Sequence, residues 1–256
     1  MERIGIIGVG EIGTAIVDGL CDGTDPAPRV FLSPRGAEAA AALAARHTGV
    51  TVCTDNQEVV DRSDLVVLAL RRRDRHAAAA GLHVPDDRVL VNLIPGVSAA
   101  ELTTLLGTRA ETVRAIPLPT VRQRRSVTVT WPSHPRVDAF FDRLGGALPV
   151  AQEADFDIFS TVTGSLSIHY HYLMTLASWV SEHGVPAADA ERYLRGLFAG
   201  IGRSLDDRSR SLTDLAVNHE TPGGSNERVR TAWFTEDNVA ALRGTLDSLL
   251  ADLRRG

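Results

Sequence analysis

The feature that most constrains the fold of this chain is a set of three closely spaced glycines near its start. Gly8, Gly10 and Gly13 follow directly on the apolar run at 3–7, and a helical pattern continues over 14–20. The first glycine permits a tight turn, the second lets the backbone approach a pyrophosphate, and the third lets the helix pack closely on the strand. The helix amino terminus adds N–H donors and the positive end of a dipole. The predicted dinucleotide-binding turn comprises Gly8, Val9, Gly10, Glu11, Ile12 and Gly13.

Beyond this turn, short apolar runs alternate with helical patterns, which is typical of a doubly wound α/β sheet. We expect strands at 30–32, 50–52, 64–70 and 88–93 and from 112 and 126, with helices over 37–47, 57–62 and 99–106, the last entered through Ser98. Strand patterns disappear from about Glu153. The rest of the chain predicts helices over 154–183, with a loosening around Gly164, and over 187–205, 212–218, 226–232 and 235–254. The fold class is therefore α/β, with an N-terminal Rossmann-type sheet and an all-α C-terminal region.

Composition excludes several classes of protein. A net charge of −5 argues against a general nucleic-acid binder, and the longest apolar runs are far shorter than the roughly 20 residues of a membrane-spanning helix. Two cysteines, Cys21 and Cys53, are too few for a disulfide framework or a four-cysteine zinc site. Because the first strand begins almost at once, no secretory signal peptide is expected. We expect a cytoplasmic protein with no nucleic-acid partner and no membrane partner.

Lysine is absent from the chain, and all 27 basic residues are arginine. This excludes a Schiff-base lysine, a lysine general acid and a Walker-type phosphate loop.

The end of the second predicted strand indicates which dinucleotide binds. NAD-specific enzymes place Asp or Glu there to bind the ribose 2′-hydroxyl, whereas this chain has Ser33-Pro34-Arg35 and no acid before Glu38. The Arg35 guanidinium and the Ser33 hydroxyl suit a 2′-phosphate. We therefore expect NADP(H) to be preferred over NAD(H), with the alternative that Arg35 is an ordinary solvated arginine.

Taken together, the motifs resemble those of the pyrroline-5-carboxylate reductase family over nearly the whole chain. The opening is similar to "IGFIGxGxMGxAI", "DNQEVVDRSDLVVLAL" to "xNxEAVxxADVVxLAVKP", "VNLIPGVSAAEL" to "ISIxAGVxxxxL", "VRAIPLPTVRQRRSVTV" to "VRxMPNTPAxVxxGxT", and "TPGGSN" to "SPGGTT". The resemblance implies an NADP-binding Rossmann domain over 1–152 and a helical dimerisation and substrate domain over 153–256. It also implies a homodimer formed through the C-terminal helices, and reduction of a C=N bond by NAD(P)H.

The resemblance further implies which residues contact the cofactor. Ser33 and Arg35 match the family's phosphate-binding turn, and Asn56 matches an asparagine that lies against the adenosine. The cofactor set is completed by Leu70, Arg71 and Pro95.

The departures from the family fall where the substrate would bind. Leu118 replaces the asparagine of "MPNTPA", and Asn226 replaces the second threonine of "GGTT", which is associated with the substrate carboxylate. Of "SGSGPAY" only Thr163-Gly164-Ser165 is matched. Cofactor motifs thus persist while substrate motifs drift, which favours a related imine, in specialised metabolism, as the substrate. Pyrroline-5-carboxylate itself stays the alternative.

The candidate catalytic residues are Thr163, Ser165, His169 and Tyr170. Ser165 and His169 are one helical turn apart and can share a face, and the alternative is that His169 and Tyr170 are helix-surface or interface residues. His169 and His171 point about 200° apart on a helix and cannot share a metal ion, so no metal is expected. The candidate substrate-binding residues are Leu118, Gly223, Gly224, Ser225 and Asn226, with a plain capped turn as the alternative for the last four.

The predicted function is NADPH-dependent reduction of a cyclic imine, a small-molecule substrate. Two alternatives stay open. The first is a non-catalytic NADP(H)-binding sensor that has lost its substrate site. The second is a carbonyl reductase of the β-hydroxyacid type, which is disfavoured because such enzymes rely on a lysine that this chain lacks.

Overall fold

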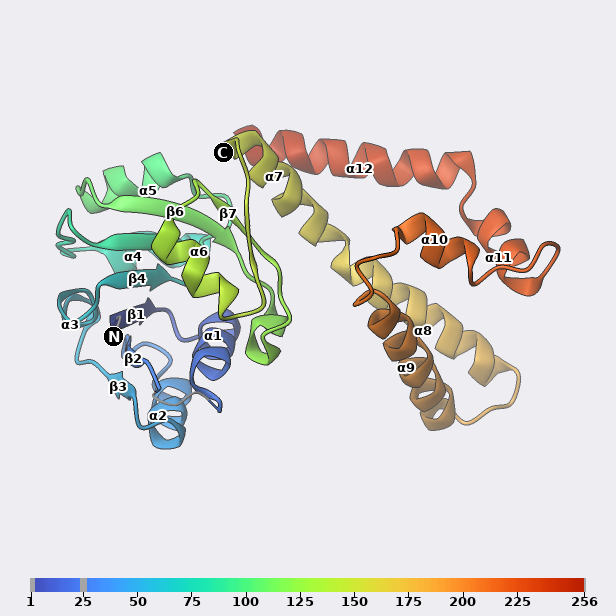
Figure 1. The fold of residues 1–256 in the computed structure, drawn as a ribbon, viewed down its shortest axis with the longest axis horizontal. Helices are drawn as coiled ribbons and strands as arrows, with labels where there is room; N and C mark the ends of the chain where they lie inside the picture. Colours follow the sequence, from blue (N-terminus) through green and yellow to red (C-terminus); the bar gives the residue numbers. More distant parts are fainter. Residues whose placement is uncertain (1–2, 24–26, 256) are drawn as a thin grey trace. The chain divides into compact units, whose positions relative to one another are not determined.

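The computed structural model describes residues 3–23 and 27–255, and the chain divides into two compact units (Figure 1). The first unit comprises residues 1–160 with 253–256, and the second comprises residues 161–252. The division falls within helix α7 (Glu153–Val162).

The first unit alternates strands and helices as predicted. Its strands are β1 (Arg3–Ile7), β2 (Arg29–Leu32), β3 (Val50–Val52), β4 (Leu65–Leu68), β5 (Val89–Asn92), β6 (Glu111–Ile116), β7 (Thr128–Trp131) and β8 (Ala147–Pro149). Its helices before α7 are α1 (Glu11–Cys21), α2 (Ala37–Arg46), α3 (Asn56–Asp61), α4 (Arg75–Ala79), α5 (Ala99–Leu106) and α6 (Pro135–Asp142), with short 3₁₀ turns η1 (Arg72–Asp74) and η2 (Pro119–Gln123).

The strands form one sheet in the order β3-β2-β1-β4-β5-β6-β7-β8. The first six strands are parallel, β7 is antiparallel to β6, and β8 is parallel to β7. The chain changes direction across the sheet at β1, which pairs with β2 on one side and β4 on the other. In open α/β sheets, ligands bind outside the carboxyl ends of the strands at such a switch point. The predicted doubly wound sheet and the helical C-terminal region are confirmed.

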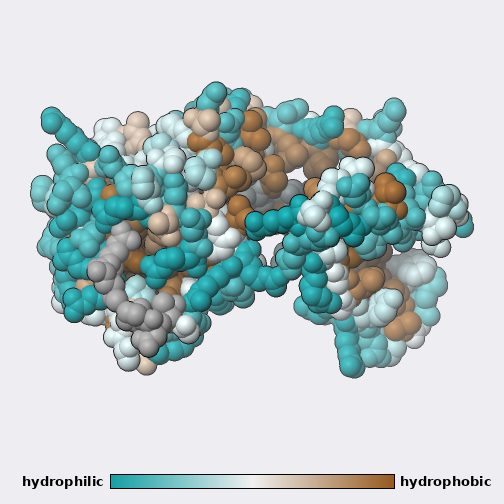
Figure 2. Space-filling view, in the orientation of Figure 1, coloured by the Kyte–Doolittle hydropathy of each residue, from teal (hydrophilic) through white to brown (hydrophobic). Residues whose placement is uncertain are grey.

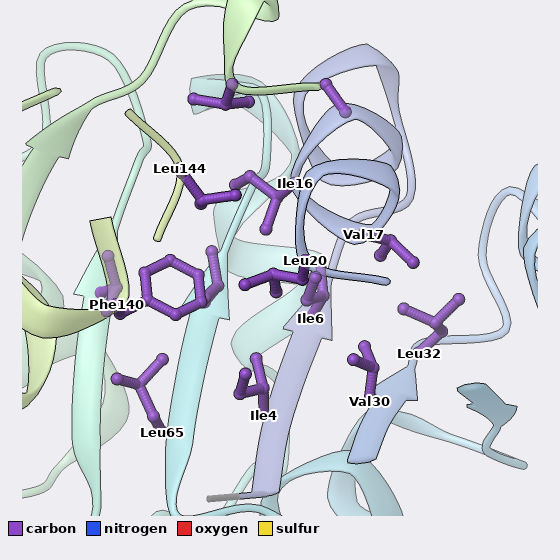
Figure 3. Close-up of a cluster of buried hydrophobic side chains, with 14 of the residues drawn as sticks. Ile4, Ile6, Ile16, Val17, Leu20, Val30, Leu32, Leu65, Phe140 and Leu144 are labelled. Atoms are coloured by element: carbon purple, nitrogen blue, oxygen red, sulfur yellow. The ribbon is translucent and has the colours of Figure 1, made fainter. Parts of the chain in front are cut away.

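Each face of the sheet is covered by its own set of helices. On one face Ile4, Ile6 and Leu65 pack against Ile16 of α1 and Phe140 of α6 (Figure 3). On the opposite face, residues of α3 and α5 pack against side chains that the strands direct the other way. Side chains along each strand point alternately to the two faces of the sheet. Because both faces are buried, the sequences of the strands are continuous apolar runs.

Helices α4 and α6 and strand β8 of the first unit were not predicted. Helix α6 places Val137, Phe140 and Phe141 inside the core, and the His134 side chain accepts a hydrogen bond from the Arg136 N–H at its start. Strand β8 has only three residues and ends in Pro149, so its own sequence carries no strand pattern. Its pairing with β7 defines it.

A buried carboxylate joins three elements of the first unit. Asp18 of α1 is 4% exposed and accepts hydrogen bonds from the guanidinium groups of Arg46, at the end of α2, and Arg122, in η2. The Arg122 Nε–Asp18 Oδ2 distance is 3.0 Å, and Nε2 of His47 lies 3.3 Å from the other oxygen. Since the carboxylate is out of water, these partners satisfy oxygens that would otherwise be unpaired.

The second unit consists of helices, as predicted. They are the 3₁₀ turn η3 (Thr163–Ser165), α8 (Leu166–Glu182), α9 (Ala187–Ser204), α10 (Leu212–Val217), α11 (Ser225–Trp233) and most of α12 (Glu236–Arg255). The turn η3 interrupts the helical run at the predicted loosening near Gly164, and the Thr235 hydroxyl accepts a hydrogen bond from Asn238 N, as expected of a cap.

Large apolar side chains remain exposed on the second unit, and Figure 2 shows hydrophobic residues at its surface. Tyr193 is 69% exposed, Trp233 is 60% and Phe234 is 62%. Among its described residues, the buried hydrophobic ones are Ala190, Leu194 and Leu215. Many large apolar side chains of these helices are therefore exposed in the part of the chain that the structure describes. Within the described residues, no helix is long and apolar enough to cross a membrane.

The Asp18 cluster leads to a prediction about stability. Replacing Asp18 with Asn should lower the free energy of unfolding by about 2 kcal/mol, because two arginines lose their buried counter-charge. The Asp22→Asn variant, whose side chain is 59% exposed, should lose less than about 0.5 kcal/mol. Urea unfolding followed by circular dichroism would test this, and equal losses in the two variants would show that the cluster is not stabilising.

Candidate functional site

The turn between β1 and α1 lies at the carboxyl edge of the sheet and has a backbone that requires glycine. Gly8 has a φ of +104°, and a Cβ on it would stand 2.3 Å from the carbonyl oxygen of Ala69. A Cβ on Gly13 would stand 2.3 Å from the carbonyl oxygen of Gly8. Neither position tolerates a side chain. The tight turn and the close helix packing that the sequence predicted for these two glycines are present.

Gly10 is different, because a Cβ built there would have no atom within 4 Å. It is exposed and begins α1 as its N-cap residue, with no side chain capping the helix. The first N–H groups of a helix have no partner within the helix and attract anions. The open side of the turn therefore has room for a group to approach the main chain, and the residues fit the pyrophosphate of a dinucleotide.

The end of β2 is attached to this turn by Ser33. The Gly8 N–H donates to the Ser33 hydroxyl oxygen over 3.0 Å, and Ser33 is 1% exposed. At Gly36, the N-cap residue of α2, a Cβ would stand 2.9 Å from the Val9 carbonyl oxygen. The two loops are thus in close contact. In the structure Ser33 links them, and its predicted contact with a 2′-phosphate stays a prediction.

Arg35 follows Ser33 at the same edge, and its side chain is 64% exposed. Its Nη2 lies 3.0 Å from Oδ1 of Asp74, which ends the 3₁₀ turn η1 after β4. Arg35 was predicted from the sequence as a cofactor residue, but Asp74, which lies 39 residues away in the sequence, was not identified. A carboxylate therefore stands beside the cation predicted to bind the 2′-phosphate.

The other predicted cofactor residues also follow strand ends at this edge. Asn56 begins α3 after β3 and donates to the Ala78 carbonyl over 3.2 Å. Leu70 and Arg71 follow β4, and Pro95 follows β5. Because β1 to β5 are parallel, their carboxyl ends share one edge, so the predicted cofactor residues are brought together there. Leu118, predicted to contact substrate, is half-buried after the end of β6.

The predicted catalytic residues lie in the second unit. Thr163 and Ser165 belong to η3, and His169 and Tyr170 to α8. The Ser165 hydroxyl donates to the Val162 carbonyl over 2.7 Å. The rings of His169 and of Phe198 on α9 have centroids 5.8 Å apart in an edge-to-face arrangement, and Tyr170 is 67% exposed.

Two side chains of α11 form hydrogen bonds at the glycine turn that precedes this helix. The Gly223 N–H donates to Oε2 of Glu227 over 2.6 Å, and the Asn226 side-chain amide donates to the His219 carbonyl over 2.6 Å. Glu227 was not identified from the sequence as part of this turn. Its place at the third residue of α11 is the signal that could have revealed it, since Glu at that position often reaches back to the N–H groups before the helix.

Residues 3–96 match the protein family described as "NADP oxidoreductase coenzyme F420-dependent". Among curated proteins, the chain is similar to the pyrroline-5-carboxylate reductase of Corynebacterium melassecola, with 25% identity over 88% of this chain and 87% of that protein.

Among solved structures, a pyrroline-5-carboxylate reductase from Coxiella burnetii is similar with a TM-score of 0.83 and 20% identity, covering 99% of this chain and 98% of that one. An imine reductase from Aspergillus terreus in complex with NADPH4 and dibenz[c,e]azepine is similar with a TM-score of 0.56 and 17% identity, covering 99% and 95%. At these identities the two structures show a shared fold.

Proposed function

We propose that this chain is a divergent member of the pyrroline-5-carboxylate reductase family of oxidoreductases and that it reduces the C=N bond of a cyclic imine with NADPH. The observation that carries the proposal is the open glycine turn at the switch point of the sheet, in a chain similar to such reductases over most of its length. The substrate is pyrroline-5-carboxylate or a related imine.

We propose that residues 1–152 bind the cofactor and that NADPH is preferred over NADH. Gly10 and the start of α1 offer main-chain N–H groups to the pyrophosphate. Arg35 offers a planar guanidinium to the 2′-phosphate at an edge where no acid follows β2 before Glu38. Asp74 competes for the same guanidinium, so it reduces the preference for NADPH over NADH without reversing it.

In the proposed reaction a reduced nicotinamide supplies a hydride to the imine carbon, and the nitrogen takes a proton. The chain's task is to orient the reactants and exclude water. Residues 153–256 supply the substrate-side groups, among which Thr163, Ser165, His169 and Tyr170 are the candidates to hold or donate the proton. The absence of lysine fits this chemistry, because a protonated imine is a good hydride acceptor without a lysine to polarise it.

We also propose that the protein is a homodimer formed through the C-terminal helices. Support comes from the exposed apolar side chains of the second unit, which has few buried hydrophobic residues of its own. Burying such side chains against a second copy would stabilise both copies by about 25 cal/mol for each Å² of apolar surface removed from water. A small-molecule imine is the other proposed partner.

The cofactor proposal predicts opposite effects for the two members of the Arg35–Asp74 pair. Arg35→Ala should weaken NADPH binding about 10- to 100-fold and NADH binding much less, since the lost contact is a charge-assisted one to the 2′-phosphate. Asp74→Asn should tighten NADPH a few-fold. Kd values from fluorescence titration would check both.

The matched control for this pair is Asp87→Asn, which removes an acid that is 74% exposed and precedes β5 at the opposite edge of the sheet. It should leave both Kd values unchanged. Equal losses of NADPH and NADH binding in Arg35→Ala would reject the assignment of the 2′-phosphate site.

The catalytic proposal predicts that His169→Phe lowers kcat for imine reduction at least about tenfold, because a proton donor or hydrogen bond is lost. The NADPH Kd should stay the same. Phenylalanine keeps an aromatic ring beside Phe198, so packing is preserved. NADPH oxidation with pyrroline-5-carboxylate, pyrroline-2-carboxylate and uncarboxylated imines would be followed by absorbance.

The control for His169 is His171→Phe, two residues along the same helix and pointing elsewhere. Unchanged kcat in His169→Phe would make that histidine a packing residue. NADPH binding without turnover of any imine would instead favour a sensor.

The dimer proposal predicts a mass about twice 27.5 kDa in sedimentation equilibrium. Leu242→Glu, which places a charge on an apolar side chain of α12 that is 39% exposed, should shift the protein toward monomer. Arg243→Glu, one residue along, should not. A monomeric wild-type protein at micromolar concentration would contradict the proposal.

A further inference from the structure

The glycine turn before α11 was expected to bind an anionic or polar group of the substrate through its N–H groups. In the structure two of these groups already have partners inside the chain. The Gly223 N–H donates to Glu227 over 2.6 Å, and the Gly224 N–H donates to the Thr221 carbonyl over 2.7 Å. Two of the donors assigned to the substrate are therefore satisfied before any substrate binds.

The partner of Gly223 is itself an anion. Glu227 lies in the first turn of α11, where a carboxylate interacts favourably with the N–H groups and the dipole of the helix. It occupies the kind of position that a substrate carboxylate would take at this turn. A second carboxylate arriving there would lose the Gly223 donor and would meet a like charge at short range.

Two polar side chains next to the turn, those of Asn226 and Arg230, have partners inside the chain. The Asn226 amide is held by the His219 carbonyl. The Arg230 guanidinium donates to both carboxylate oxygens of Glu220, with Nη2–Oε2 at 3.0 Å, so its charge is compensated. Arg228 follows Glu227 on the same helix and is exposed.

Leu118 is an independent observation in the first unit. It places a hydrocarbon side chain just after the carboxyl end of β6, at a position where the resembling family has an asparagine amide. An apolar group there favours an uncharged part of a substrate over a carboxylate.

From these observations we propose that the substrate is an imine without a carboxylate beside its C=N bond, and that Glu227 is the residue that excludes carboxylated imines. The inference rests on the proposed imine reductase function. The reaction then converts the imine, NADPH and one proton into an amine and NADP⁺, with the hydride added to carbon and the proton to nitrogen.

The test compares 1-pyrroline with pyrroline-5-carboxylate, which differ by the carboxylate alone. For the wild-type protein, kcat/KM should be at least about tenfold higher for 1-pyrroline. In Glu227→Gln the ratio of kcat/KM for the carboxylated imine over the uncarboxylated one should rise about tenfold, since the charge is removed while the amide oxygen can still accept from Gly223. Glu236→Gln, the same change in the first turn of α12, should leave the ratio unchanged.

Three outcomes would overturn the inference. A wild-type preference for pyrroline-5-carboxylate would reject it and leave the proposed function standing. An unmoved ratio in Glu227→Gln would reject the role of that residue. Turnover of neither imine by a protein that still binds NADPH would reject the proposed function and this inference with it.

Discussion

The carboxyl edge of the first unit depends on one close approach of two backbones, in which the turn at Gly8 passes against the carbonyl of Ala69. A side chain there would collide at 2.3 Å. Ser33 fixes the Gly8 N–H from the end of β2, and Gly36 leaves space for the Val9 carbonyl. Because Gly8, Gly10 and Gly36 carry no side chains, an anion can approach the main-chain N–H groups at the start of α1. A small change in any of these residues would alter the whole edge.

Most of the first unit could be predicted because its elements are defined by local signals. Strands such as β4 are continuous apolar runs, and Ser98 caps α5 by accepting from Glu101 N at 3.0 Å, as its position before a helical pattern indicated. Strand β8 shows the limit of this reasoning. It exists because β7 offers an edge to pair with, and that edge is a property of the assembled sheet, which no local pattern records.

In the candidate site, too, some features could be predicted from local sequence and others depend on the assembled sheet. The sequence located the loops that carry it, since glycines and strand ends mark them, but it did not show which side chains hold one another. Arg35 and Asp74 meet only because β2 and β4, the strands that precede them, lie on either side of β1 in the sheet. Glu227 is different, because its partner Gly223 is four residues away. The position of Glu227 at the third residue of α11 is a local signal for that contact. It was not used, because the turn was interpreted as a substrate-binding turn.

The two predicted anion sites differ in how their charged side chains are held. The Arg35–Asp74 pair is exposed, and exposed pairs contribute only about 0–1 kcal/mol, so a doubly charged phosphate can displace the acid. At the second site, the glycine turn before α11, the acid is Glu227 of that helix. Its carboxylate oxygen accepts a hydrogen bond from the Gly223 N–H. An incoming carboxylate would have to break a contact that stabilises the helix start. In the proposed arrangement one acidic side chain, that of Glu227, excludes a second carboxylate from the turn without any change of the fold.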